Sequence, residues 1–125
     1  MLSITLDKSE AVVTLKPEGR LSQEDFETAV RIIDPFIKIR KTLTGIIIDA
    51  HDFSAWDEFA AYMKHLTFIR TSHRKLKRIA WMGDMPDETL RTSLTDHFVS
   101  AQVQTFPSAA AKEAKAWILE AQNEA

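Results

Sequence analysis

The sequence predicts an α/β domain with a mixed, mostly parallel β-sheet, and three observations lead to that prediction. The chain opens with two short alternating apolar segments, strand-like and helix-like segments then alternate, and TGIIIDA (residues 44–50) is β-branched and apolar on both faces. Alternation of strand-like and helix-like segments after an opening hairpin is typical of parallel strands joined by crossover helices. The predicted order is β-β-α-β-α-β-α-β-α, with about four helices. We expect one domain over residues 1–125, since 125 residues with 45% hydrophobic content form a single core.

The opening hairpin follows from period-two alternation. The segment LSITLD directs Leu2, Ile4 and Leu6 to one side, and the segment AVVTLK follows after a turn over residues 8–10. Two antiparallel strands are therefore expected at the start of the chain.

The first helix is predicted after Pro17 and Gly19. Ser22 is a suitable N-cap, and Asp25 follows three residues later. Pro35 is expected to kink or interrupt this helix near residue 34. The apolar face at helical spacing comprises Phe26, Ala29, Val30 and Ile33.

The remaining elements are read in the same way. Residues 44–50 are predicted as a central strand covered on both sides, and residues 55–71 as the helix that crosses over from it. KRIAWMGD (residues 77–84) predicts a further buried strand, a short helix follows near Pro86, and AQVQTF predicts the last strand. Ser108 is expected to cap a final helix, whose shared face comprises Ala110, Ala114, Trp117, Ile118 and Ala121.

Composition excludes several classes of function. Sixteen basic and eighteen acidic residues give a formal charge of -2, so no overall field favours nucleic acid. The chain has no cysteine, which excludes disulfides and thiolate chemistry and fits a reducing compartment. No stretch approaches the roughly 18 apolar residues of a membrane span, and the start of the chain lacks a signal-peptide pattern. We therefore expect a cytoplasmic protein without stable membrane insertion.

A polar cluster follows the predicted central strand. Carboxylates and a histidine are the ligand types of oxygen and nitrogen metal sites, but no second histidine at helical spacing completes a ligand set here. A small hydrolase built on Asp49, His51 and Ser54 is disfavoured, because three triad members within six residues rarely reach the required geometry and no G-x-S-x-G elbow occurs. We expect no catalytic residue, metal or cofactor. The residues weighed as metal ligands are Asp49, His51, Asp52, Asp57 and Glu58.

The predicted helix over residues 55–71 has more apolar surface than one sheet can cover. Tyr62 and Phe68 lie off the centre of its apolar stripe, so apolar side chains extend unusually far around it. Either a neighbouring helix packs there, or the excess surface binds a lipid-like ligand or a second protomer. The candidate hydrophobic ligand or partner surface comprises Trp56, Phe59, Met63, Leu66 and Ile69.

A basic segment, RTSHRKLKR, continues from this helix over residues 70–78. Its simplest interpretation is a helix end that runs through a solvated loop into the next strand. The functional alternative uses Arg70, Arg74 and Lys75 to contact an anionic group or an acidic partner. RNA is disfavoured because exposed interleaved aromatic residues and a basic domain are both missing.

Three runs, IIIDAHDFSAW, KRIAWMGD and VQTFPSAAAKEAKAWI, span nearly the whole chain. Together, and in this order, they resemble the SpoIIAA-like family of small bacterial proteins, which are relatives of the STAS domain. The resemblance implies a mixed-sheet fold with four helices, no known catalysis, and a proposed role in binding hydrophobic ligands or partner proteins.

The relationship to STAS domains raises a further question, because anti-sigma-factor antagonists of that superfamily have a phosphorylatable serine at a helix start. Aligned from Asp49, their second aspartate falls on Asp57, while the Ser-Ser-Gly run falls on Glu58, Phe59 and Ala60. The acceptor hydroxyl is absent. Ser54 remains nearby, and we expect it to cap the next helix instead.

Together these observations predict a non-enzymatic binding module. The expected partners are a hydrophobic or lipid-like small molecule, a second copy of the chain, or both, bound through the apolar helix. The alternative is a STAS-type regulatory protein-interaction partner, similar to an anti-sigma antagonist but without the phosphorylatable serine.

Overall fold

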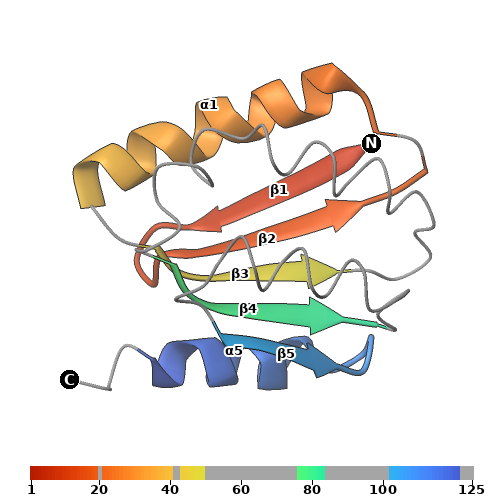
Figure 1. Ribbon diagram of the computed structural model, residues 1–125, viewed down its shortest axis with the longest axis vertical. Coiled ribbons are helices and arrows are strands. Elements are labelled where there is room, and N and C mark those ends of the chain that lie inside the picture. Colours follow the sequence, from red (N-terminus) through yellow and green to blue (C-terminus); the bar gives the residue numbers. More distant parts are fainter. Residues whose placement is uncertain (20, 41–42, 50–75, 84–101, 122–125) are drawn as a thin grey trace.

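The computed structural model describes residues 1–19, 21–40, 43–49, 76–83 and 102–121, and Figure 1 shows how their elements are arranged. These residues form five strands and two helices. In chain order they are β1 (Leu2–Asp7), β2 (Val12–Pro17), α1 (Gln23–Arg40), β3 (Leu43–Asp49), β4 (Leu76–Met82), β5 (Gln102–Phe106) and α5 (Ala111–Glu120). The helices predicted over residues 55–71 and near Pro86 lie outside the described residues.

The strands form one sheet in the order β1-β2-β3-β4-β5. β1 pairs antiparallel with β2, placing Ile4 opposite Leu15, and the other three pairs are parallel. In Figure 1 the β1 arrow accordingly points opposite to the other four. The predicted mixed, mostly parallel sheet with an opening hairpin is confirmed.

Helix α1 packs on one face of the sheet. Its Phe26, Ala29 and Ile33 belong to a buried cluster that also contains Leu15 and Ile48. The predicted inward residues of β1 join the same cluster, Leu2 as a buried member and Ile4 and Leu6 as partly buried ones. This face therefore holds most of the core.

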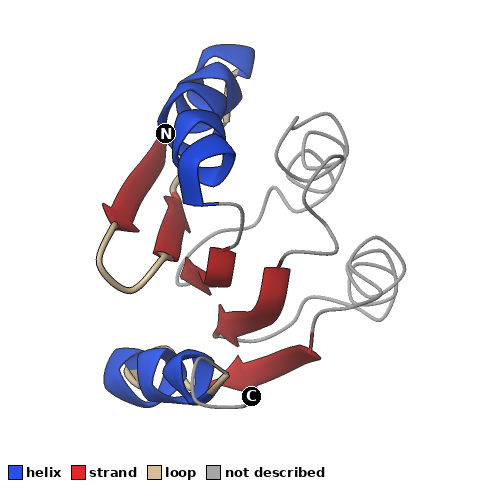
Figure 2. Ribbon diagram, turned by 90° about the vertical axis from the view of Figure 1, so that its left-hand side faces the viewer, coloured by secondary structure: helices blue, strands red, loops and turns tan. Residues whose placement is uncertain are grey.

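Helix α5 covers a second cluster on the other face. Ala114 and Ile118 of α5 pack there with Ile47, Ala80 and Met82. In Figure 2 the strands lie between α1 and α5. β3 is therefore covered on both sides, as the sequence predicts, and its residues are buried from Leu43 to Ile48.

The close contact between β3 and α5 depends on Gly45. A Cβ atom built on Gly45 would lie 2.9 Å from Cδ1 of Ile118, closer than real carbon contacts allow. Glycine at this position lets α5 approach the sheet, and Ile118 fills the space and is fully buried.

The hairpin turn and the start of β3 are joined through Ala11. Ala11 adopts a positive φ of 57°, a conformation that residues other than glycine, asparagine and aspartate rarely take. Its carbonyl oxygen accepts the Thr44 N–H at 2.8 Å. The turn is therefore tied to the strand that lies beside it in the sheet.

Helix α1 begins as predicted but does not stop at Pro35. The predicted interruption near residue 34 is wrong, because the helix continues through Pro35 to Arg40. Ile33 and Phe36 are buried on either side of the proline, while Pro35 itself is exposed. Packing of the flanking turns therefore offsets the backbone hydrogen bond that proline cannot donate.

The predicted cap of the last helix is also wrong. The N-cap of α5 is Ala110 rather than Ser108, and no side chain caps this end of the helix. Ser108 lies in a turn, which the hydrogen bond from the Ala110 N–H to the Pro107 carbonyl oxygen closes at 2.9 Å. Of the predicted apolar face, Ala114, Ile118 and Ala121 are buried.

Candidate functional site

The candidate residues predicted from the sequence fall in parts of the chain that the structure does not describe. This holds for the hydrophobic surface of Trp56, Phe59, Met63, Leu66 and Ile69, and for the basic residues Arg70, Arg74 and Lys75. Of the polar cluster, Asp49 alone is described. It ends β3 and is half-buried.

The last two cations of the basic segment have a structural role. Arg78 is only 6% exposed, and its guanidinium donates hydrogen bonds to the carbonyl oxygen of Trp117 and to Oε2 of Glu120 (3.3 Å). Lys77 Nζ donates to the carbonyl oxygen of Ala121 at 3.4 Å. The last turn of α5 contains no basic residue. Arg78 and Lys77 of β4 therefore supply the positive charge that interacts favourably with the C-terminal carbonyl groups of α5.

Arg78 also lies over an aromatic pair. Its guanidinium carbon is 4.8 Å from the centroid of the Trp117 ring, and that ring is 5.7 Å from Phe106 at a tilt of 55°. The solvated-loop interpretation therefore does not extend to Arg78, which is a buried contact between β4 and α5. Sequence analysis missed this role because Trp117 lies 39 residues further along the chain.

A second charged group joins the hairpin turn to α5. Lys115 Nζ lies 3.0 Å from Oδ2 of Asp7 and 3.3 Å from Oε1 of Glu10. Hydrogen bonds from the Ser9 side chain, Lys115 and the Glu10 N–H lower the pKa of Asp7 well below its usual range. The same carboxylates raise the pKa of Lys115. Lys115 offsets part of the negative charge of the two carboxylates, and the contacts join the hairpin turn to α5.

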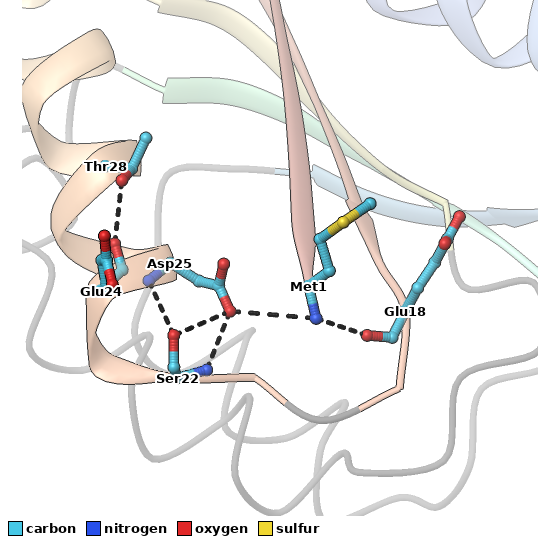
Figure 3. A network of polar contacts seen from close by, with 6 residues as sticks. All are labelled: Met1, Glu18, Ser22, Glu24, Asp25 and Thr28. Carbon is cyan, nitrogen blue, oxygen red and sulfur yellow. Dashed lines mark hydrogen bonds and ion pairs between the residues drawn. The ribbon is translucent and has the colours of Figure 1, made fainter.

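The third group lies at the start of α1, where Figure 3 shows the contacts. The Ser22 N–H donates to Oδ2 of Asp25 at 2.9 Å, and the Asp25 N–H donates back to Oγ of Ser22 at 3.2 Å. The hydrogen bond from the Ser22 backbone lowers the pKa of Asp25. This reciprocal pair is a capping box, which confirms Ser22 as the predicted N-cap. The ammonium of Met1 lies 3.9 Å from the same Oδ2.

The described surface contains one apolar feature that the sequence prediction did not single out. Ile39 is 79% exposed and Ile32 is 39% exposed, and both lie on α1 together with the exposed Pro35. With half-buried Thr28 they follow the spacing 28, 32, 35, 39, which aligns them along one side of a helix. We call these four residues the α1 face. The sequence signal was available, because Ile32 and Ile39 lie outside the apolar face predicted for this helix.

Among the residues that the structure describes, no group of three or more histidine, aspartate or glutamate side chains is placed to hold a metal ion. Neither α1 nor α5 is long and apolar enough to cross a membrane.

The fold and these contacts define an α/β protein whose mostly parallel sheet has helices on both faces and an exposed apolar strip on its first helix. The chain matches the SpoIIAA-like family over residues 12–119 and belongs to that family. Comparisons with curated proteins and with solved structures returned no match.

Proposed function

We propose that this protein is a non-enzymatic, regulatory protein-interaction module. Within the described residues, the proposed contact surface is the α1 face. The observation that carries the proposal is the exposure of Ile39 and Ile32 on an otherwise well-packed helix. Membership of the SpoIIAA-like family supports a regulatory interaction role.

The physical properties of the α1 face suit a contact surface. Burying an exposed isoleucine stabilises a complex by about 1.5–3 kcal/mol before the costs of association are counted. β-branched side chains on a helix have few rotamers, and proline has none to lose, so little side-chain entropy is lost on binding. Phe26, Ala29 and Ile33 pack the other side of α1 against the sheet. The helix backbone that carries the α1 face is therefore held in place before a partner binds.

Site-specific photo-crosslinking in the native cell tests this proposal. A benzophenone amino acid is placed at Ile39, and a matched control carries it at Lys112, an exposed position on α5. We expect a protein adduct at position 39 that is absent at position 112, whether the captured chain is another protein or a second copy. Equal labelling at both positions, or none at 39, would contradict the proposal.

A hydrophobic or lipid-like ligand is a second candidate, and a specific sequence feature favours it. The sequence pattern over residues 55–71 predicts a helix whose apolar residues extend beyond one stripe; they include Trp56, Phe59, Met63, Leu66 and Ile69, and the cations Arg70, Arg74 and Lys75 follow in the sequence. Native mass spectrometry of freshly purified protein, followed by organic extraction, tests this candidate. A released acyl or isoprenoid species that is lost when Phe59 and Met63 are replaced by glutamate supports a carrier or sensor. Protein without any such species contradicts it.

The anti-sigma antagonist type of partner is a narrower version of the same interaction role. Without the phosphorylatable serine, such a partner would bind constitutively, and Glu58 would supply a permanent negative charge where the switch serine would otherwise be. Co-purification of a kinase-like protein, undiminished when Ser54 is replaced by alanine, is the expected result. Loss of that protein with Ser54→Ala would instead indicate a serine switch.

A further inference from the structure

We infer that the α1 face binds a second copy of this chain, with the two α1 helices antiparallel about a two-fold axis. This inference rests on the proposed function, because it takes the α1 face as the interaction surface and names its occupant. Three features of α1 lead to it: the apolar strip, the order of charges beside the strip, and the size of the contact.

The apolar strip matches the seam of a helix pair. The intervals between Thr28, Ile32, Pro35 and Ile39 are four, three and four residues, which is the spacing that keeps side chains on one line facing a partner helix. The Thr28 hydroxyl donates to the Glu24 carbonyl oxygen at 2.9 Å and accepts from Nη2 of Arg31 at 3.1 Å, so its polar group is satisfied within the helix. Its methyl group is therefore suited to an apolar contact.

The charges beside the strip select an antiparallel copy. Along one flank, Glu24 and Glu27 precede Arg31 and Lys38, and all four side chains are exposed. A two-fold axis perpendicular to the helix places this flank of one chain beside the same flank of the other, with the direction reversed. Glu27 of each chain then approaches Lys38 of the other, whereas a parallel two-fold pair would place this flank beside the opposite flank of the partner and would not form these contacts. The charges of this flank are therefore complementary to themselves in the antiparallel orientation.

The size of the contact predicts a reversible dimer. An 18-residue helix is about 27 Å long, and one helix face buries less than the roughly 800 Å² per partner of a standard stable interface. The equilibrium should therefore depend on concentration.

Sedimentation velocity of the purified chain over a wide concentration range tests the inference. We expect the wild type to pass reversibly from monomer to dimer. Glu27→Lys and Lys38→Glu should each weaken the dimer about tenfold, because each brings two pairs of like charges together at the interface. The control Lys112→Glu reverses a charge on the exposed side of α5 and should leave the dimer unchanged.

Mixing the two charge-reversed proteins gives the sharpest result. The Glu27→Lys chain carries lysine at both positions and the Lys38→Glu chain carries glutamate at both, so a one-to-one mixture should form a heterodimer at least as tight as the wild-type dimer. Circular dichroism checks that each variant retains its helix, and recovery on mixing would itself exclude misfolding as the cause of weakening.

Three results would overturn the inference. These are a wild type that stays monomeric at every concentration, a dimer that neither reversal affects, and weakened variants that do not associate on mixing. A monomeric wild type together with a crosslink from position 39 to a different protein would overturn the homodimer and leave the proposed interaction function standing.

Discussion

Lys115 of α5 and Asp7 of β1 form an ion pair between elements 108 residues apart in the chain, with Nζ 3.0 Å from Oδ2. The pair fastens the hairpin turn to the last helix, over the sheet face that α5 covers. The hydrogen bond from the Ser9 side chain, and after it the contact with Lys115, lower the pKa of Asp7 in the folded protein, so stability depends on pH.

The first prediction concerns Asp7→Asn. A carboxyl whose folded pKa lies below its unfolded value, about 3.9, stabilises the protein above that value and loses this contribution as the pH falls towards the folded pKa. Asp7→Asn should therefore be less stable than the wild type near neutral pH, and the difference should shrink as the pH is lowered below about 4.

Urea unfolding at neutral pH and at two acidic pH values measures this difference. Glu18→Gln is the matched control, since Glu18 forms an exposed ion pair with Lys16 and should change stability little. A destabilisation by Asp7→Asn that is the same at every pH would contradict the assignment.

The second prediction concerns Arg78. Arg78→Met preserves much of the apolar stem but removes the hydrogen bonds to Trp117 and Glu120 and the stacking on the Trp117 ring. We expect the free energy of unfolding to fall by about 2–3 kcal/mol, because a charge-assisted hydrogen bond contributes about 1.5–3 kcal/mol and the partly buried Trp117 carbonyl loses its partner. Arg78→Lys should recover only part of this, since lysine lacks the planar fork.

Chemical denaturation followed by circular dichroism gives the free energy of unfolding of each variant. The neighbouring Lys77→Met removes one long hydrogen bond at an exposed side chain and should change stability by less than about 0.5 kcal/mol. Equal losses at positions 77 and 78 would show that Arg78 has no special role.

The third prediction concerns the close approach at Gly45. Gly45→Ala should destabilise the protein by about 1–3 kcal/mol, since the new methyl group overlaps the Ile118 side chain. In the Gly45→Ala background, Ile118→Ala should be less costly than in the wild type, because removing the isoleucine also removes the clash. A double-mutant cycle measures this coupling, and strict additivity would contradict it.

The fourth prediction concerns Pro35. Proline inside a helix costs about 3 kcal/mol relative to alanine, and part of this is offset because proline also restricts the unfolded chain. Pro35→Ala should therefore stabilise the protein by about 1–2 kcal/mol at this exposed site. Thermal and urea unfolding at low protein concentration measures the change in the monomer. Lys38→Ala, an exposed change in the same helix, should have little effect, and an unchanged or lowered midpoint for Pro35→Ala would contradict the prediction.

Sequence patterns predicted those features that local chemistry determines. The buried run of β3 and the Ser22–Asp25 capping box depend on residues within a few positions of each other, and both were predicted. Ser108 has equally suitable cap chemistry, yet the helix begins after Ala110, because a turn closed by Pro107 comes first. A cap residue alone does not reveal how many residues the preceding turn takes up.

Long-range packing determined the features that the sequence did not predict. Pro35 stays within a continuous helix because Ile33 and Phe36 bind the turns beside it to the sheet. Arg78 is buried because the end of α5 lies over it, although its sequence context is a run of cations. The α1 face was missed although Ile32 and Ile39 lie outside the apolar face predicted for this helix; the sequence marks them as off that face, and the structure adds how far each is exposed.

The position of α5 has a consequence for biosynthesis. α5 covers one face of β3 and β4, and among the described elements it is synthesised after all the others. Until it emerges, the apolar residues Val12, Ile47, Ala80 and Met82 lack the helix that buries them. Between the synthesis of β4 and that of α5, the nascent chain therefore lacks the helix that covers this apolar sheet face, and chaperones that recognise exposed apolar surface can bind there during that interval.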